Sequence, residues 1–291
     1  MRLCVIGDMH VYRLLLWPWH LFSKRVLGQA NLWFFRRLKF QMKLMKHVVD
    51  EAMETDADLY TFTGDLTTTS LPGEFRLAKD MLEPILQTQR GLMVPGNHDA
   101  YTFRAGASER LREAFPDEVP EKFPYFTMIK DNWFALALDS ATPRIFSSRG
   151  WLGHDQMSRI AHYLSTLGPH QGVVIVCHYP LFVPPNVRHV WNHDLADREK
   201  LAELVTDCRA RVLFLHGHVH RPWCYRPVEE RLSHVVDINA GAPVYCTNAY
   251  PYGQGFWHVD LPEDPKRPIE AVHHFRDETG DWRTSDTTEP A

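Results

Sequence analysis

Short apolar runs of strand type alternate with amphipathic helical patterns along much of this chain, and this alternation limits the possible folds more than any other feature. Strands that alternate with helices are typical of an α/β fold. With 291 residues, of which 44% are apolar, the chain can bury a full core. The expected strands are 2–7, 58–64, 91–95, 133–139, 173–177 and 212–216.

Helices are expected between several of these strands. Over residues 35–52, apolar residues recur at the spacing of one helix face, with Lys and Arg on the other face. Late strands without intervening helices predict a second sheet packed against the first. We expect one domain over residues 1–275 and a flexible polar tail over 276–291. The other expected helices lie near 74–87, 155–167 and 198–210, and the late strands at 234–240, 255–261 and 269–275.

Polar side chains that can bind metal stand where five of the expected strands end. The sequences are "GDMH" (7–10), "GDLT" (64–67), "GNHD" (96–99), "CHYP" (177–180) and "HGHVH" (216–220). In α/β sheets, ligands bind beyond the carboxyl ends of the strands, so these side chains should converge. Asp8 and His10 are two residues apart and should share a face, and His218 and His220 should do the same if their segment stays extended. His216 itself is predicted to belong to a buried strand.

The mixed set of oxygen and imidazole donors fits Mn, Fe, Zn, Co or Ni better than Ca or Mg. Seven donors exceed the usual needs of one ion. If Asp65 bridges, two ions about 3.5–4 Å apart can be held, which activates a water and stabilises the attacking and leaving oxygens at phosphorus. The candidate ligands are Asp8, His10, Asp65, Asn97, His178, His218 and His220.

In this order, D-x-H, GD, GNHD, H and GHxH resemble the calcineurin-like metallophosphoesterase superfamily, over roughly residues 1–260. The resemblance implies a four-layer αββα sandwich and two divalent transition metals, with Mn²⁺ favoured. It implies a first metal on Asp8, His10, Asp65 and His220, and a second on Asp65, Asn97, His178 and His218. It also implies that His98 protonates the leaving group or stabilises the transition state, and that Asp99 orients His98.

An aromatic and basic insertion is expected to follow the first strand, over residues 11–46, as a helical cap or membrane-facing element. Residues 9–49 hold eight Lys or Arg and no Asp or Glu, although the whole chain has a formal charge of −4 and no general attraction to nucleic acid is implied. Aromatic and basic residues together are typical of a membrane interface or of an anionic amphiphile as ligand. The alternative is a helical hairpin that packs its aromatic residues onto the core.

The resemblance and the insertion together predict a hydrolase that uses a metal-activated water on a phosphodiester or pyrophosphate bond. The expected substrate is amphiphilic or nucleotide-linked, as is UDP-2,3-diacylglucosamine in bacterial lipid A biosynthesis, which related enzymes cleave. A soluble cyclic-nucleotide phosphodiesterase and a membrane-docking scaffold without activity are the alternatives. Candidate substrate contacts are Arg104, Arg149, Arg188, Trp17, Trp19 and Trp33.

Cysteine usage and the N-terminal sequence bear on the compartment. Five scattered cysteines suit free thiols in a reducing compartment. Asp8 and His10 interrupt any apolar signal region, and "LLLWPWHLF" (14–22) is far shorter than the ~20 residues of a membrane span. We therefore expect a cytoplasmic protein that binds peripherally to the inner membrane.

Overall fold

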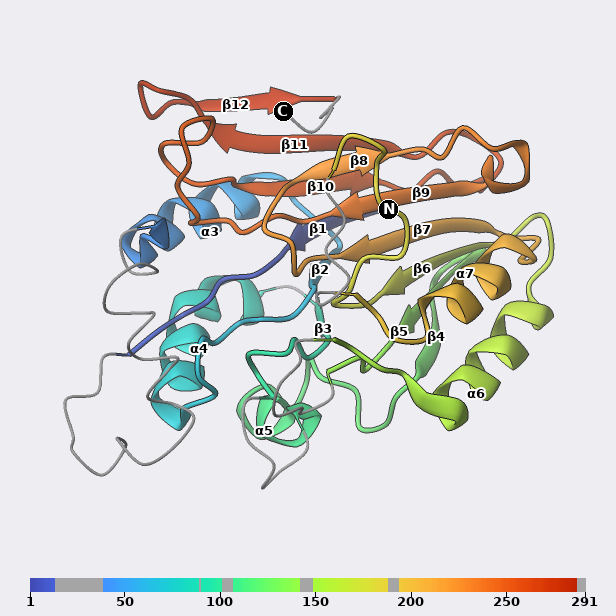
Figure 1. Cartoon of the computed structure of the whole chain (residues 1–291). Helices are drawn as coiled ribbons and strands as arrows, with labels where there is room; N and C mark the ends of the chain where they lie inside the picture. Colours follow the sequence, from blue (N-terminus) through green and yellow to red (C-terminus); the bar gives the residue numbers. More distant parts are fainter. Residues whose placement is uncertain (14–38, 89, 101–106, 142–148, 188–193, 287–291) are drawn as a thin grey trace.

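The computed structural model describes residues 1–13, 39–88, 90–100, 107–141, 149–187 and 194–286. Its framework is two six-stranded mixed sheets (Figure 1). The first sheet has the order β12 (Trp282–Ser285), β11 (Glu270–Arg276), β10 (Phe256–Asp260), β1 (Arg2–Ile6), β2 (Leu59–Phe62) and β3 (Arg90–Met93). The second has the order β4 (Tyr125–Lys130), β5 (Trp133–Ala137), β6 (Gly172–Val176), β7 (Arg211–His216), β9 (Val235–Asn239) and β8 (Trp223–Tyr225).

Each sheet has a parallel centre, which places the ends of its strands at one edge. In the first sheet β1 pairs parallel with β2, and β2 with β3. In the second sheet β5, β6, β7 and β9 are all parallel neighbours. The strands β4, β8, β10, β11 and β12 are antiparallel additions. The loops after β1, β2, β3, β6 and β7 therefore leave from the carboxyl ends of the parallel strands.

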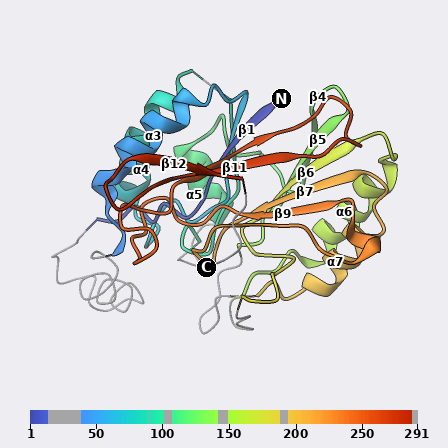
Figure 2. The same cartoon turned by 90° about the horizontal axis from the view of Figure 1, so that it is seen from above.

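Helices cover the two outer faces of the paired sheets. Figure 2 shows α3 (Met45–Glu54) and α4 (Pro72–Leu86) on one side and α6 (Gly153–Thr166) and α7 (Arg198–Thr206) on the other. The helix α5 (Ala107–Ala114) also covers the first sheet, and the described residues include the short 3₁₀ helices η3 (Met42–Leu44) and η5 (Glu230–Leu232). The structure is therefore the expected four-layer αββα sandwich.

Alternation along β1 explains why the core has separate layers. Leu3 and Val5 face the second sheet and belong to the apolar layer between the sheets. Cys4 and Ile6 point the other way and pack with α3 and α4. Successive strand residues point to opposite faces, so an uninterrupted apolar run is what a strand covered on both sides requires.

The expected second sheet is present, but the late strands do not form it together, and that part of the expectation was wrong. β9 joins the second sheet beside β7, whereas β10 and β11 extend the first sheet antiparallel to β1. An apolar run specifies a buried strand but not its partner. The C-terminal expectation also needs correction, because residues 282–285 form β12 on β11, with the Trp282 ring 6.0 Å from that of Phe256.

The expected insertion lies only partly within the described residues. Residues 14–38 fall outside them, as do Trp17, Trp19 and Trp33. The helix expected over 35–52 begins as α3 at Met45, after η3. Within the described part of the chain, no helix has the length and apolar content needed to cross a bilayer.

Two adjacent histidines of β11 are buried as neutral groups. His273 is fully buried, stacks on Trp257 at 4.7 Å, and donates from Nε2 to the Gln254 carbonyl at 2.6 Å. Burial lowers the pKa of His273 to about 3, and burial together with the Arg2 charge lowers the pKa of His274 to about 4. Protonation of either imidazole is therefore unfavourable in the folded protein.

We expect these histidines to make stability depend on pH. Below about pH 6.5 the unfolded chain binds protons that folded His273 does not, so the free energy of unfolding should fall by about 1.4 kcal/mol per pH unit for this group. Above pH 6.5 both states are neutral and the group adds no slope. Urea unfolding between pH 7.5 and 4.5 measures this effect. His273→Asn, which keeps a donor for Gln254, should show a shallower slope, and equal slopes would contradict the prediction.

Candidate metal centre

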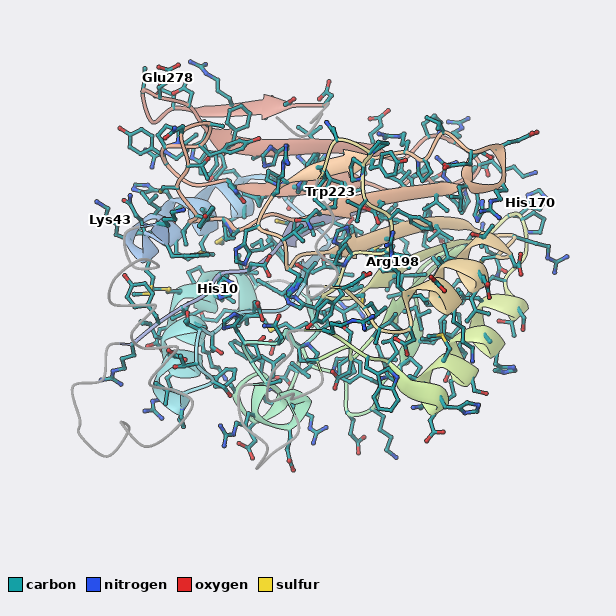
Figure 3. All side chains as sticks on the ribbon, in the orientation of Figure 1. His10, Lys43, His170, Arg198, Trp223 and Glu278 are labelled. Carbon is teal, nitrogen blue, oxygen red and sulfur yellow. The ribbon has the colours of Figure 1, made fainter. Side chains whose placement is uncertain are left out.

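Five loops at the carboxyl ends of the parallel strands bring the expected ligands together. Asp8 and His10 follow β1, Asp65 follows β2, and Asn97 follows β3. His178 follows β6, and His218 and His220 follow β7. The site therefore spans both sheets, and His10 is labelled in Figure 3.

The donors form two groups that share one carboxylate. Ligand atoms of Asp8, His10, Asp65 and His220 all lie within 4.8 Å of one another, and so do those of Asp65, His178 and His218. Asn97 Oδ1 lies 3.0 Å from His178 Nε2, which adds a fourth donor to the second group. All seven expected ligands are thus close together. Asp65 occupies the place that a bridging carboxylate requires.

The spacing and chemistry of the donors fit divalent transition metals. His10 Nε2 and His220 Nε2 are 2.8 Å apart, and His218 Nδ1 and His178 Nε2 are 3.1 Å apart. Two ligands of one ion at 2.0–2.2 Å lie about 3 Å from each other. Among the described residues, buried Asp8 Oδ1 has no hydrogen-bond partner, as expected of an oxygen that serves as a metal ligand.

The loops that carry the donors are not extended, which corrects the expected reason for their convergence. His10, Asp65, His218 and His220 have φ values of 47°, 52°, 72° and 49°. Residues other than glycine rarely adopt this left-handed region, and such strain persists where surrounding contacts enforce it. Two hydrogen bonds are among these contacts. The His10 N–H donates to the Asp65 carbonyl at 2.9 Å, and the His218 N–H donates to Asp8 Oδ2 at 2.7 Å.

The pKa values of the two buried carboxylates of the centre are shifted in opposite directions. Burial raises the pKa of Asp8 well above its usual range. Burial also opposes ionisation of Asp65, but the neighbouring imidazoles, His178 first, hold the pKa of Asp65 well below its usual range. Against the effect of burial, the Asp65 and Asp8 charges raise the pKa of His178 to about 9. A cation bound here would take the place of these protons, since metal ligands bind deprotonated.

His98 lies at the opening of the site and is oriented by a backbone carbonyl. It is half-buried, its ring centroid is 4.7 Å from that of His10, and its Nδ1 lies 2.7 Å from the Thr68 carbonyl oxygen. The peptide N–H of His98 also donates to Asp65 Oδ1 at 2.7 Å. The sequence pattern carried no signal for Thr68, because a carbonyl is present in every residue.

The hydrogen bonds of Asp99 differ from those expected of a residue that orients His98. Its buried carboxylate accepts hydrogen bonds from the backbone N–H groups of Gly96, Leu66 and Thr67 and from Thr67 Oγ1. Among the described residues, the donors to this carboxylate belong to the loops after β2 and β3, and the His98 ring is not one of them. Asp99 therefore holds the loops after β2 and β3 together, whereas Thr68 orients His98.

A buried polar network supports the loop after β7, and sequence reasoning missed it. His216 is buried in β7 as expected, and its Nε2 lies 2.9 Å from Asp237 Oδ1, which also accepts from Trp223 Nε1 at 2.9 Å. Asn239 Nδ2 lies 3.0 Å from His216 Nδ1 and donates to the Gly217 carbonyl at 2.7 Å. The polar residues of "VVDIN" in a buried strand were the available signal.

Of the remaining expected contacts, only Arg149 lies within the described residues. It is half-buried beside Gly150, which packs against Tyr179, and the Tyr179 ring is 4.4 Å from that of His218. This places the Arg149 backbone on the side of the second donor group. Arg104 and Arg188 fall outside the described part of the chain.

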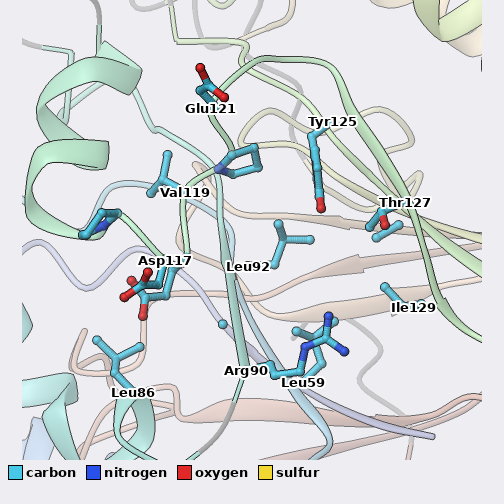
Figure 4. A pocket seen from close by; sticks show the side chains of 15 residues that line it. Leu59, Leu86, Arg90, Leu92, Asp117, Val119, Glu121, Tyr125, Thr127 and Ile129 are labelled. Atoms are coloured by element: carbon cyan, nitrogen blue, oxygen red, sulfur yellow. The ribbon is translucent and has the colours of Figure 1, made fainter.

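A separate cavity of about 510 Å³ lies between β3 and β4, the edge strands of the two sheets (Figure 4). Its lining includes leucine and isoleucine side chains, acidic residues, Arg90 and Tyr125. Among the described residues that line it, none is an expected metal ligand. The cavity is therefore distinct from the metal centre.

The class of protein follows from the fold, the two donor groups and the family comparison together. A model of the calcineurin-like phosphoesterase family matches residues 1–222. The chain belongs to this family of phosphoester hydrolases, and the family and the clustered Asp and His residues indicate a dinuclear site for divalent metals.

Particular relatives are bacterial phosphodiesterases by name. The chain is 26% identical over 179 residues to the 3′,5′-cyclic adenosine monophosphate phosphodiesterase CpdA of Haemophilus influenzae, covering 62% of this chain and 60% of that protein. It is 30% identical to a cAMP/cGMP dual specificity phosphodiesterase of Mycobacterium tuberculosis, over 56% of this chain and 48% of that one. The chain thus spans about half to three fifths of the length of these relatives.

A solved structure shares the whole architecture. The dimetal phosphatase from Danio rerio superimposes with a TM-score of 0.66 at 13% identity, covering 99% of both chains. PhoD superimposes with a TM-score of 0.56 at 11% identity, over 100% of this chain and 72% of that chain. At such low identity these similarities establish the fold alone.

We expect Asp65→Ala to lose both metals, because Asp65 belongs to both donor groups. Elemental analysis of purified protein after dialysis with Mn²⁺ measures the content. Asp80→Ala, on the exposed surface of α4, removes a carboxylate elsewhere and should keep wild-type content. Wild-type metal content in Asp65→Ala would contradict the shared position of this carboxylate.

We expect Asp237→Asn to weaken metal binding about 10-fold, the lower end of the range seen when a group that orients a ligand is altered. Two N–H donors face one oxygen of Asp237, so an amide there cannot serve both as well as a carboxylate does. Competition with a chromogenic chelator gives the affinity, and circular dichroism checks the fold. Unchanged affinity in a folded variant would show that the network does not act on the loop after β7.

Proposed function

We propose that the chain is a dinuclear metal-dependent phosphodiesterase, with Mn²⁺ as the working ion. The observation that carries the proposal is the pair of donor groups that share Asp65, with a half-buried His98 at their opening. Two such ions, when bound, supply a water of lowered pKa and positive charge for the phosphate oxygens. All seven donors are present, which favours an enzyme over a scaffold of the same fold.

In this proposal His98 donates the proton that the leaving group needs. Nδ1–H donates to the Thr68 carbonyl, which fixes the ring and leaves Nε2 as the second nitrogen. In the imidazolium form Nε2 also carries a proton, which it can donate to the leaving oxygen, while the neutral form offers none from Nε2. His98 thus acts as a general acid or as a stabiliser of negative charge.

The names of the relatives support a diester as the substrate. They are phosphodiesterases for cyclic nucleotides, and a third is a probable glycerophosphodiester phosphodiesterase of Arcobacter nitrofigilis, 27% identical over 56% of this chain. A small soluble diester is therefore the first substrate to test.

A lipid-linked substrate is the second candidate, and the basic segment favours it. Residues 9–49 hold eight cations and no anion, and Lys39, Lys43 and Lys46 are exposed in the structure. Such a segment would attract an anionic lipid surface or a pyrophosphate-linked lipid such as UDP-2,3-diacylglucosamine.

A substrate panel separates the candidates. The Mn²⁺-loaded protein would be assayed on bis-p-nitrophenyl phosphate, cyclic AMP and UDP-2,3-diacylglucosamine, and floated with phosphatidylglycerol vesicles at low salt. Joint replacement of Trp17, Trp19 and Trp33 by Ser should affect only the lipid assays if the lipid candidate is right. A protein that ignores the vesicles and prefers cyclic AMP excludes that candidate, and no hydrolysis with any divalent ion favours the scaffold.

We expect His98→Ala to lower turnover of cyclic AMP about 10²–10⁴-fold, the usual contribution of a general acid, without loss of metal. The loss should be smaller for bis-p-nitrophenyl phosphate, because p-nitrophenolate departs without a proton. His170→Ala, an exposed histidine labelled in Figure 3, is the matched control and should behave as wild type. Equal losses on both substrates would rule out the general acid, and loss of metal would make His98 a ligand.

A further inference from the structure

A short backbone ladder fixes residues 39–41 beside the metal centre. The Cys246 N–H donates to the Lys39 carbonyl at 2.8 Å, and the Gln41 N–H donates to the Val244 carbonyl at 3.0 Å. Between them, Phe40 and Tyr245 form an antiparallel bridge. The position of Lys39 is therefore set by main-chain bonds to the loop 244–246.

Aromatic contacts place this ladder against the first donor group. The Phe40 ring is buried, 4.8 Å from the His10 ring and 5.4 Å from the His220 ring. The Tyr245 ring lies 4.8 Å from Phe40 and 5.7 Å from His220. His10 is buried, whereas His220 and Tyr245 are half-buried, so Tyr245 stands at the opening of the centre.

Lys39 and Tyr245 together present two donors to an anion. Lys39 Nζ lies 3.3 Å from Tyr245 Oη and 5.6 Å from the centroid of its ring. The ammonium donates to the phenol oxygen, so the phenol proton can be donated to a further acceptor. Among the described residues, no carboxylate forms an ion pair with Lys39, and the segment 9–49 contains none. An ammonium with a phenol O–H beside it suits a phosphate oxygen.

We propose that Lys39 and Tyr245 bind a second phosphate of the substrate, beyond the one that is cleaved. This rests on the proposed phosphodiesterase function, in which the scissile phosphate lies at the metal donors. The Tyr245 ring neighbours the His220 ring, and Lys39 Nζ contacts the phenol oxygen of Tyr245. A phosphate bound by the pair is therefore separated from the phosphate at the metal donors, and the substrate needs a spacer between them such as a nucleoside. The chain then selects doubly phosphorylated diesters over diesters that carry a single charge.

Two substrates that differ only in the second phosphate test the proposal. They are the p-nitrophenyl ester of thymidine 5′-phosphate, with and without a 3′-phosphate. In the wild type, KM should be about 5-fold lower for the 3′-phosphorylated ester, the scale of one exposed ion pair. Lys39→Gln and Tyr245→Phe should each reduce this preference while leaving KM for the singly charged ester unchanged. Tyr245→Phe keeps the ring that packs on Phe40 and His220.

A charge-matched control and a binding readout complete the experiment. Lys46→Gln removes an exposed lysine of α3 that pairs with Asp50 at 2.7 Å, and should keep the preference. Calorimetry with thymidine 3′,5′-bisphosphate and thymidine 5′-phosphate measures the same preference without turnover. If neither ester is hydrolysed, the proposed function fails, and the calorimetric comparison still decides the second-phosphate proposal.

Two outcomes would overturn the inference. One is equal affinity of the wild type for the two nucleotides, and the other is a preference that survives Lys39→Gln. If that variant also loses binding to phosphatidylglycerol vesicles, Lys39 binds a lipid headgroup instead of the substrate.

Discussion

Buried Asp65 makes the contacts that hold the loops of the centre together. Its main-chain carbonyl accepts from His10 N, its Oδ1 accepts from His98 N at 2.7 Å, and its Oδ2 lies 3.4 Å from His178 Nε2. Gly96 approaches so closely that a Cβ there would lie 2.2 Å from Asp65 N. Loops from four strands in both sheets thus meet at one residue. Their contacts keep the backbone of Asp65 in the left-handed region.

Two further buried carboxylates hold the loops, one in each half of the sandwich. Asp99 receives N–H donors from the loops after β2 and β3, and Asp237 receives the His216 and Trp223 side chains below the loop after β7. Buried carboxylates are costly unless hydrogen bonds satisfy them. The partners of Asp99 come from loops that carry metal donors, and His216, a partner of Asp237, ends the strand that precedes His218, so the cost of burial is linked to the order of the site.

The residues of the centre differ in how deeply they are buried. Asp8, His10, Asp65, His178 and His218 are buried, whereas Asn97, His98, His220 and Tyr245 are half-buried. The buried donors sit on strand ends that the double core holds in place. The half-buried residues lie nearer the surface, and there the end of the basic segment pairs with the loop 244–246.

The sequence by itself determined the parallel strands, most of the helices and the donor types of this protein. The layer order followed from the family resemblance, and β4, β8, β12 and α5 were not expected. The alternation in β1 and the polar residues after β1, β2, β3, β6 and β7 are local patterns, which the chain expresses wherever its segments are placed. Tertiary structure decided the partners of β10 and β11, the left-handed turns at His10 and His218, the orientation of His98 by Thr68, and the support of His216 by Asp237. These features depend on contacts between distant segments, such as His218 N to Asp8 Oδ2 across 210 residues. No local periodicity encodes such contacts, because each is fixed only when segments far apart in the sequence come together, within one sheet for β1 and β10 and between the two sheets for Asp8 and His218.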